Sequence, residues 1–195
     1  MEEAIENISE KIAGTICNKS RELEIITYGV HQTIIMILNL LLTVVSGIVW
    51  HELFFMAVMF LYFSTLRPYA GGYHAETEGK CFVISFAMVN LVLFGKQHFR
   101  LGVPAYLLIY LASMAVILLW APIGNPNKTL DMTERAVYRR KSQIIAAAGF
   151  VSFITAVIFK WRILYEGIVW GMILTAALLT IGKIKYREPI VMQRY

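Results

Sequence analysis

Six stretches of the chain are almost wholly apolar, and short polar segments separate them. They cover residues 26–49, 53–66, 81–94, 101–121, 144–159 and 163–181. A helix that crosses the hydrocarbon core of a bilayer needs roughly 20 predominantly apolar residues. The pattern therefore predicts an all-α integral membrane protein with about six transmembrane helices.

Three of these runs, the second, third and fifth, are shorter than a full crossing requires. Such a helix can draw on flanking residues, thin the bilayer locally, or end inside a cavity lined by protein. A short helix whose end lies below the headgroups is a suitable place for a buried site.

Residues 2–23 precede the first run and are rich in polar residues. Isoleucines recur at steps of three and four, at Ile5, Ile8, Ile12 and Ile16, with charged residues on the other sides. This spacing predicts an amphipathic helix that lies at the membrane interface or against the rest of the protein. Cys17 falls in this helix with no histidine near it in sequence, and we interpret it as a bystander.

Composition supports a membrane setting. The chain has 195 residues, of which 58% are hydrophobic and 16% charged, and its mean hydropathy is +0.62. A soluble domain averages roughly 45–50% apolar and about 25% charged residues. One soluble core cannot absorb this excess, so we expect a single membrane domain over residues 1–195. Two cysteines do not make a disulfide framework, and each thiol is expected to be reduced.

The basic residues report the orientation. With the N-terminus inside the cell and six crossings, 14 of the 18 Lys and Arg residues fall in inner segments. Cytoplasmic loops of membrane proteins carry such an excess of Lys and Arg, so both termini and the loop at 67–80 are predicted to be cytoplasmic. The net charge of +5 is thus a topology signal and does not predict a nucleic-acid partner. The outer segments hold Lys96, Arg100, Lys160 and Arg162.

One polar segment, RPYAGGYHAETEGKC at residues 67–81, combines a histidine, a cysteine and three glycines. Pro68 is expected to end the second helix, because proline does not extend a helix. Gly71 and Gly72 permit positive φ and close approach of another backbone. His74 and Cys81 would be about 10 Å apart along one straight helix, so their meeting requires a bend, which Gly79 offers.

The position of Cys81 favours nucleophilic chemistry. If the third helix starts near Lys80, Cys81 lies in its first turn, where the helix dipole and the free N–H groups favour a thiolate. His74 on the loop can then share the proton, as the base of a cysteine peptidase does. The alternative stays open at this point, with Cys81 a small apolar residue and His74 an interfacial polar group.

Other candidate sites are weaker. His51-Glu52 begins like the zinc-protease pattern HExxH, but Phe occupies position 55. The remaining histidines are scattered, so no metal site and no cofactor are predicted. Glu166 is either a functional intramembrane acid or the i, i+4 partner of Arg162.

The segment RPYAGGYHAETEGKC resembles the signature of the accessory gene regulator B (AgrB) family, the integral-membrane cysteine peptidases of Gram-positive quorum sensing. The similarity covers the Arg-Pro, the Ala-Gly-Gly-Tyr-His-Ala and the cysteine seven residues after the histidine. Size, the apolar runs and the basic loop with NPNKTL also fit, so the resemblance spans nearly the whole chain.

The resemblance implies that His74 and Cys81 form the catalytic pair of a cell-membrane enzyme. The implied substrate is an AgrD-type propeptide with an amphipathic leader, a central signal segment and an acidic C-terminal tail. The family enzyme removes that tail through an acyl-thioester and promotes cyclisation of the signal segment to a thiolactone or lactone.

Several groups are candidates to support this chemistry. Glu76 is either an orienting group for His74 or a solvated loop carboxylate. Arg67 is a candidate partner of a substrate carboxylate or of anionic lipid. The oxyanion donors are expected among the N–H groups of Gly71 and Gly72 or at the start of the third apolar helix. The basic run 135–141 either attracts the acidic tail or reports only topology.

Two other classes of function remain compatible with the sequence. One is a polytopic peptide carrier or exporter with no chemistry of its own, in which the His–Cys loop is a gate. The other is a membrane adaptor for a signalling peptide. The small size is compatible with a homodimer, although the residues specify no interface.

Overall fold

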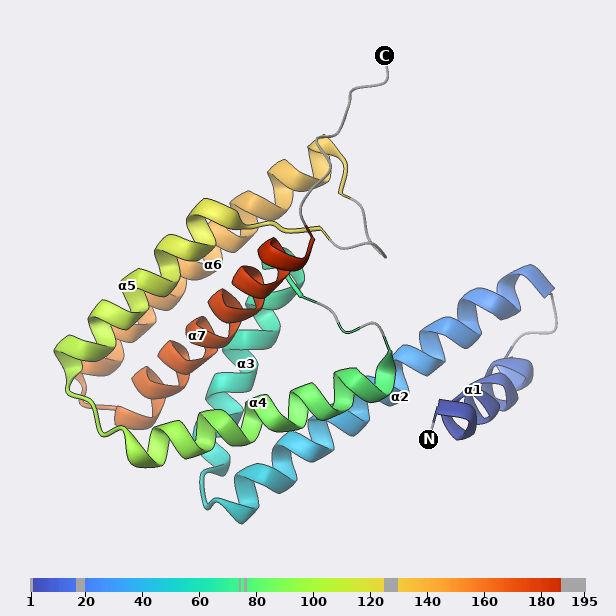
Figure 1. Ribbon diagram of the computed structural model, residues 1–195, viewed down its shortest axis with the longest axis horizontal. Coiled ribbons are helices and arrows are strands. Elements are labelled where there is room, and N and C mark those ends of the chain that lie inside the picture. Colours follow the sequence, from blue (N-terminus) through green and yellow to red (C-terminus); the bar gives the residue numbers. More distant parts are fainter. Residues whose placement is uncertain (1, 17–19, 74, 76, 125–129, 187–195) are drawn as a thin grey trace. The chain divides into compact units, whose positions relative to one another are not determined.

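The computed structural model describes residues 2–16, 20–73, 75, 77–124 and 130–186. Within these ranges the chain forms helices and no β-strand (Figure 1). The helices are α1 (Glu2–Ile16), α2 (Ser20–Val49), α3 (Leu53–Ala70), α4 (Glu78–His98), α5 (Val103–Trp120), α6 (Met132–Ile158) and α7 (Arg162–Lys185). Six of them, α2 to α7, are long and apolar enough to cross a membrane. The prediction of an all-α, multi-pass membrane protein is confirmed.

The predicted N-terminal helix over residues 2–23 is wrong in its extent. Helix α1 ends at Ile16, and α2 already begins at Ser20; Cys17 lies outside the described residues. The buried positions of α1 are Ile5, Ser9 and Ala13, whereas Ile8 and Ile12 are exposed. The buried side packs on α2, so only part of the isoleucine stripe contacts protein.

Flanking residues lengthen the short apolar runs. Helices α3, α4 and α6 contain 18, 21 and 27 residues. The expectation that Pro68 ends the second membrane helix is wrong, because α3 continues to Ala70. Proline removes the hydrogen bond of its missing N–H, and its ring crowds the carbonyl one turn earlier. Because α3 ends two residues after Pro68, only its last turn is affected.

The basic residues 135–141, expected in a loop, belong to the first turns of α6. Asp131 caps this helix: its carboxylate accepts a hydrogen bond from the Glu134 backbone N–H at 2.6 Å, and the Glu134 side chain accepts one from the Asp131 N–H at 3.3 Å. This reciprocal arrangement is a capping box. It starts the helix before the basic run, which the sequence analysis had placed in a loop.

The chain divides into two compact units, residues 1–51 with 75–95 and residues 52–74 with 96–195. We call them the N-terminal unit and the four-helix unit. In the N-terminal unit, the Trp50 indole N–H donates a hydrogen bond to the Asn90 side-chain oxygen at 3.0 Å. This contact joins the end of α2 to α4. That residues 1–195 act as one domain stays a prediction.

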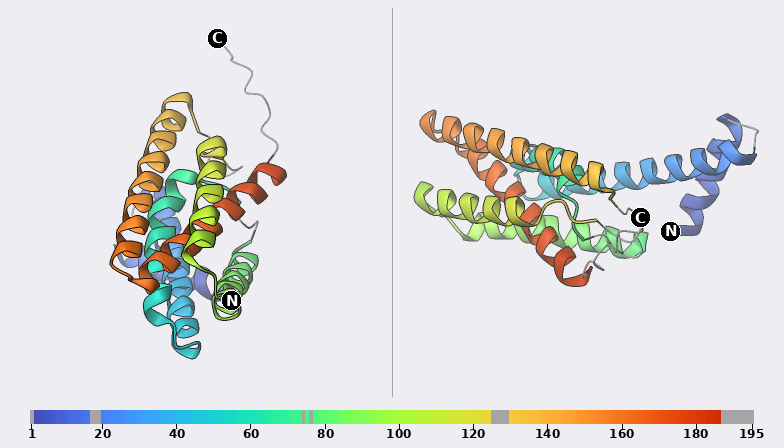
Figure 2. Two further views of the ribbon diagram at one scale, coloured as in Figure 1. Left: turned by 90° about the vertical axis from the view of Figure 1, so that its left-hand side faces the viewer. Right: turned by 90° about the horizontal axis from the view of Figure 1, so that it is seen from above.

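Helix α7 is the centre of the four-helix unit. It contacts α3, α5 and α6, and both views of Figure 2 show it crossing between α5 and α6. In its most apolar 18-residue window 61% of the residues are buried, against 18–28% in the other spans. Helices α3, α5 and α7 run in one direction and α6 in the other (Figure 1). If the chain crosses the membrane six times, successive crossings alternate in direction, and these four helices have the directions that this alternation predicts.

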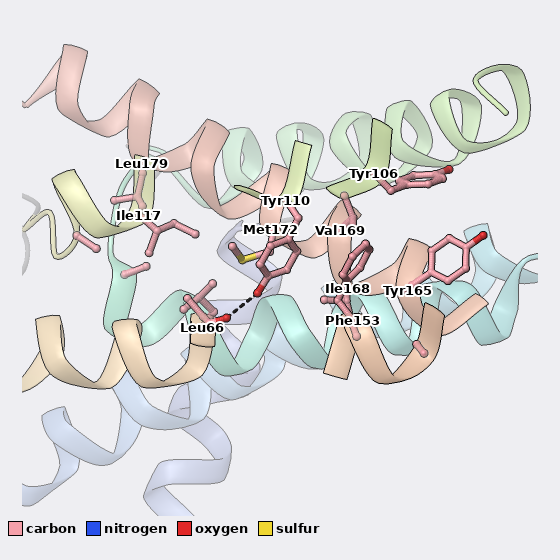
Figure 3. Packing of buried hydrophobic residues seen from close by; sticks show 14 of the residues in the cluster. Leu66, Tyr106, Tyr110, Ile117, Phe153, Tyr165, Ile168, Val169, Met172 and Leu179 are labelled. Atoms are coloured by element: carbon pink, nitrogen blue, oxygen red, sulfur yellow. Dashed lines mark hydrogen bonds between the residues drawn. The ribbon is translucent and has the colours of Figure 1, made fainter. Parts of the chain in front are cut away.

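Aromatic side chains fill the interior of this unit (Figure 3). The Tyr110 ring stacks on Phe153 with a centroid distance of 5.5 Å, and its hydroxyl donates to the Ala146 carbonyl at 2.6 Å. The Tyr62 hydroxyl donates to the Ile145 carbonyl at 3.3 Å. Buried hydroxyls need such partners, and these two bonds link α3 and α5 to the same stretch of α6.

Two glycines one turn apart allow α7 to approach α3 closely. A Cβ built on Gly167 would lie 2.7 Å from Val58 Cγ1 and 2.9 Å from Val58 Cβ, and one on Gly171 would lie 3.2 Å from the Met59 carbonyl oxygen. Small residues at such a spacing are common where membrane helices pack together. The most buried helix contact of this unit therefore depends on the absence of two side chains.

We expect Gly167→Ala to destabilise the protein by about 1–3 kcal/mol, the usual cost of overpacking a core. The new methyl group would meet the rigid, β-branched stem of Val58. The measurement is the unfolding midpoint temperature of detergent-purified protein. Gly29→Ala in α2 is the matched control, because nothing lies within 4 Å of its Cβ position. An equal or higher midpoint for Gly167→Ala than for the control would contradict the packing argument.

Candidate functional site

The segment between α3 and α4 is fixed at its beginning by two glycines in left-handed conformations. Gly71 has φ 72° and Gly72 has φ 108°, values that favour glycine. Gly71 forms a parallel β-bridge with Ile123: the Ile123 N–H donates to the Ala70 carbonyl at 3.1 Å, and the Gly72 N–H donates to the Ile123 carbonyl at 3.2 Å. A side chain on Gly71 would overlap the Ile123 carbonyl.

The same segment lies directly against the backbone of α7. The Tyr73 N–H donates to the Leu178 carbonyl at 2.9 Å. Gly182, one turn further along α7, leaves room for this approach, since a Cβ there would lie 2.7 Å from the Tyr73 nitrogen and 2.8 Å from Gly72 Cα. The Lys185 ammonium lies 5.0 Å from the Tyr73 ring centroid, at a cation–π distance. Residues 71–73 are thus docked on α7.

Arg67 holds the segment from the side of α3. Its guanidinium donates hydrogen bonds to the carbonyls of Gly71 and Tyr73. A planar guanidinium presents several N–H donors in a fixed geometry, so one side chain secures both ends of this short stretch. Arg67 therefore supports the loop through contacts within the chain.

The two glycines offer no oxyanion donor. The Gly71 N–H donates to the Arg67 carbonyl at 3.1 Å, and the Gly72 N–H is bonded to Ile123. Both groups are already used, so the expectation for Gly71 and Gly72 is not met. The beginning of α4 remains the candidate source of an oxyanion donor.

Cys81 is the fourth residue of α4, which begins at Glu78. The Thr77 hydroxyl accepts a hydrogen bond from the Lys80 N–H at 3.3 Å, as a helix N-cap does. The Cys81 N–H donates to the Thr77 carbonyl at 3.0 Å. The thiol is half-buried and forms no disulfide. Because Cα–Cβ bonds in a helix tilt toward its N-terminus, the Cys81 side chain leans toward the preceding loop.

Gly79 does not provide the bend that was expected between His74 and Cys81, because it is the second residue of α4. His74 and Glu76 lie outside the described residues, so the pairing of His74 with Cys81 stays a prediction, as does the role of Glu76. Within the described part of the chain, no three His, Cys, Asp or Glu side chains gather as metal ligands would.

A positively charged pocket of about 460 Å³ adjoins the docked segment. Arg135 and Arg139 of α6 and Lys183 of α7 line it, and Ile123, the bridge partner of Gly71, forms part of its wall. The Lys183 ammonium lies 5.9 Å from the Trp120 ring centroid. The described residues that line this pocket include no carboxylate. We call it the cationic pocket.

Sequence reasoning missed the residues that dock the loop and complete this pocket. Leu178 acts through its backbone carbonyl, and Ile123 acts through its backbone N–H and carbonyl. Every residue type except proline has both of these groups, so the sequence does not reveal such a role. Gly182 carried a weak signal as an interior glycine of an apolar helix. Arg135 and Arg139 were recognised as part of a basic run, but their juxtaposition with Lys183 requires the packing of α6 against α7.

A second polar cluster involves Glu166, whose carboxylate is almost fully buried. It accepts hydrogen bonds from Arg162 Nε at 2.7 Å and from the Tyr106 hydroxyl at 3.2 Å. The i, i+4 partnership with Arg162 is confirmed. Glu166 belongs to the four-helix unit but not to the cationic pocket.

Comparison with known proteins relates this chain to one family of membrane proteins. The family model of accessory gene regulator B matches residues 5–181. AgrB-like protein 2 of Clostridium perfringens (strain 13 / Type A) is 28% identical over 170 residues, which cover 80% of this chain and 78% of the relative. An AgrB-like protein of C. perfringens (strain SM101 / Type A) is 26% identical over 174 residues, covering 85% and 79%. These names state a likeness to the family and no activity.

No solved structure matches the chain. The family match extends from α1 to the last turns of α7 and includes the loop and Cys81. The chain therefore belongs to the accessory gene regulator B family of membrane proteins, which acts in the accessory gene regulator system of quorum sensing.

Proposed function

We propose that this protein is a membrane-embedded cysteine endopeptidase that removes the C-terminal tail of an AgrD-type propeptide and promotes closure of the remaining peptide to a thiolactone or lactone. The observation that carries the proposal is the position of Cys81. It lies in the first turns of a membrane helix, seven residues after His74 in the sequence, in a chain of the AgrB family.

The first step forms an acyl-thioester. His74 takes the proton of the Cys81 thiol, and the sulfur attacks the carbonyl carbon where the signal segment joins the tail. The C–N bond of the tetrahedral intermediate then breaks, and His74 gives the proton to the departing amine. The tail leaves with a new N-terminus, and the signal segment stays bound to Cys81.

The second step transfers the acyl group within the substrate. The side chain of an internal Cys or Ser attacks the thioester carbonyl, the bond to Cys81 breaks, and the enzyme thiol is regenerated. Exchange of one thioester for another is nearly thermoneutral, so ring closure depends on proximity and on the exclusion of water. A site at the end of a membrane helix suits both requirements.

The docked segment supports this chemistry by restricting His74. Tyr73 immediately precedes His74, and both of its backbone polar groups are held: its N–H by Leu178 and its carbonyl by Arg67. That carbonyl belongs to the peptide bond that joins Tyr73 to His74. Fixing this peptide limits the positions that the imidazole can reach, which is the kind of positioning that catalysis rewards.

The cationic pocket is proposed to receive the tail of the substrate. Its lining includes three cationic residues, whose positive charge attracts the acidic side chains of a bound peptide. The pocket adjoins Ile123 and hence the loop. A tail held there would be anchored beside the docked segment that precedes His74.

We also propose that both termini and the loop face the cytoplasm, because 14 of the 18 basic residues fall on that side. The cationic pocket lies at the same end of the four-helix unit as the docked segment.

A peptide carrier or a membrane adaptor would bind the peptide but leave it uncut. Cleavage of the propeptide therefore distinguishes the peptidase from these two alternatives.

Replacing Cys81 with alanine should abolish cleavage while binding of the propeptide is kept, because only the nucleophile is removed. The first measurement is release of the tail by purified protein reconstituted in liposomes. The second is intact mass spectrometry after rapid quenching. It should reveal an acyl adduct on the unmodified enzyme, and hydroxylamine should remove this adduct. Ser113→Ala, a change in the core of α5, serves as a handling control. Tail release by Cys81→Ala would contradict the mechanism.

Arg139→Gln should raise the KM for the propeptide and leave kcat nearly unchanged, because one charge of the cationic pocket is lost. A charge pair of about 1 kcal/mol corresponds to roughly a fivefold change in KM. Arg140→Gln is the matched control, since Arg140 is the next residue of the same helix and does not line the pocket. Equal KM values for the two variants would refute tail binding at this place.

Gly182→Ala should lower kcat at least tenfold without loss of folded protein. Its methyl group would lie 2.7 Å from the Tyr73 nitrogen, so residues 72–73 must move off α7. Hydrogen exchange of a peptide that contains Tyr73 should speed up in parallel. Gly102→Ala is the control, because its Cβ would make only an ordinary contact of 3.6 Å with Pro104. Faster exchange with full activity would show that docking does not position the site.

A further inference from the structure

The other end of the four-helix unit contains a second pocket of about 430 Å³. It is lined by residues at the beginnings of α3 and α7 and at the end of α4, whereas the cationic pocket lies at the C-terminal ends of α5 and α7. Its walls combine charged residues of both signs. The lining residues are Glu52, Lys96, Gln97, Arg100, Arg162, Ile163 and Glu166. We call it the mixed-charge pocket.

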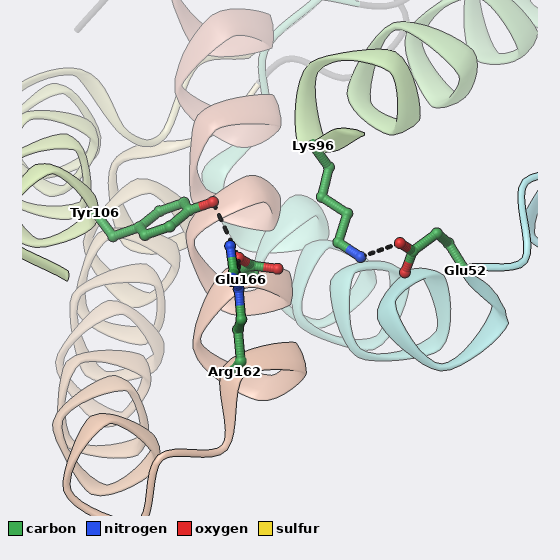
Figure 4. A network of polar contacts seen from close by, with 5 residues as sticks. All are labelled: Glu52, Lys96, Tyr106, Arg162 and Glu166. Atoms are coloured by element: carbon green, nitrogen blue, oxygen red, sulfur yellow. Dashed lines mark hydrogen bonds and ion pairs between the residues drawn. The ribbon is translucent and has the colours of Figure 1, made fainter. Parts of the chain in front are cut away.

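Both carboxylates of this pocket already have cationic partners (Figure 4). The Lys96 ammonium forms an ion pair with Glu52, and Arg162 Nε bonds to Glu166 at 2.7 Å. The Tyr106 hydroxyl adds a third group to the buried Glu166 carboxylate at 3.2 Å. A buried carboxylate needs such compensation, so neither acid is available to bind a further cation.

Arg100 differs from the other two cations of the pocket, which are paired with carboxylates. It is exposed, and it has no hydrogen-bond or ion-pair partner in the part of the chain that the structure describes. With three cations and two carboxylates, the walls carry a net charge of +1. The unbalanced charge is that of Arg100, so the pocket is suited to a ligand with a single negative charge.

The concentration of cations here is unusual for this side of the protein. The predicted topology leaves four basic residues on it, and three of them, Lys96, Arg100 and Arg162, line this one pocket. Only Lys160 does not. The preference for basic residues inside the cell explains why cations are few on this face, but it does not explain why they gather.

The pocket lies at one end of candidate membrane-spanning helices. The first residue of α7 and the residue just before α3 line the pocket, and α5 begins at Val103, three residues after the lining residue Arg100. Large aromatic side chains are exposed around this end: Phe99 is 59% exposed, and Phe159 and Trp161, both exposed, stack with a centroid distance of 5.1 Å. Exposed aromatic residues at helix ends are typical of the bilayer interface.

We infer that the mixed-charge pocket binds the headgroup of an anionic phospholipid, with its phosphodiester on Arg100 and with Lys96 and Arg162 beside it. A phosphodiester carries one negative charge and offers two oxygens, which match a planar guanidinium. The zwitterionic headgroup of phosphatidylethanolamine is disfavoured, because its ammonium would require a carboxylate, and Glu52 and Glu166 are both paired. This site is independent of the proposed peptidase activity.

Native mass spectrometry of the full chain, released from micelles that contain equal amounts of phosphatidylglycerol and phosphatidylethanolamine, tests the assignment. The unmodified protein should retain phosphatidylglycerol selectively, and Arg100→Gln should retain at least fivefold less. Lys160→Gln is the matched control: it removes one charge from the same predicted face but from outside the pocket. It should retain phosphatidylglycerol as the unmodified protein does.

Equal loss in the two variants, or no loss in either, would overturn the proposal, because the lipid would then follow the overall charge or bind elsewhere. Equal retention of the two lipids by the unmodified protein would also overturn it. A second arm uses short-chain phosphatidylglycerol and inorganic phosphate at equal concentration in a thermal-shift measurement. Only the lipid should raise the midpoint, and only with Arg100 present; an equal shift with phosphate would assign the pocket to a free anion.

Discussion

The backbone hydrogen bond from the Tyr73 N–H to the Leu178 carbonyl docks the segment after α3 on α7, and the proposed site depends on this docking. A strand-like segment approaches the side of a helix this closely only where side chains are missing, and Gly72 and Gly182 provide the gap. The bridge to Ile123 and the two bonds from Arg67 hold the same three residues from other directions. The peptide that leads into His74 is therefore defined by contacts that α3, α7 and the segment after α5 contribute together.

Close helix packing makes that arrangement possible. Helix α7 is the most buried of the spans, and Gly167 and Gly171 bring it against α3, the helix that leads into the loop. In lipid, apolar side chains gain little by leaving their surroundings for a helix interface, so van der Waals contact and hydrogen bonds between helices matter more than burial. The Tyr62 and Tyr110 hydroxyls serve the same purpose toward α6. The frame is rigid where the loop is attached.

The two ends of the four-helix unit differ in how charge is balanced. At the loop end, the described residues that line the cationic pocket include three cations and no carboxylate. At the other end, two carboxylates neutralise two of three cations, and one arginine remains. A pocket lined by several cations suits a flexible acidic peptide, and a single excess charge suits a monoanion. The balance of charge is thus the reason why the two pockets are proposed to bind different classes of ligand.

The sequence by itself determined the class of fold and the family. The apolar runs fix six membrane helices because lipid leaves the backbone few alternatives, and the segment from Arg67 to Cys81 identifies the family and the candidate nucleophile. It did not fix helix ends: Pro68 lies inside α3, and the basic run after Asp131 is helical, since caps and tertiary packing outweigh local preference.

Only the tertiary structure decided what holds the loop and where the pockets lie. Leu178 and Ile123 act through carbonyl groups that every residue possesses, and Arg139 meets Lys183 only because α6 packs on α7. Contacts between residues far apart in the chain depend on packing, which a linear pattern does not encode.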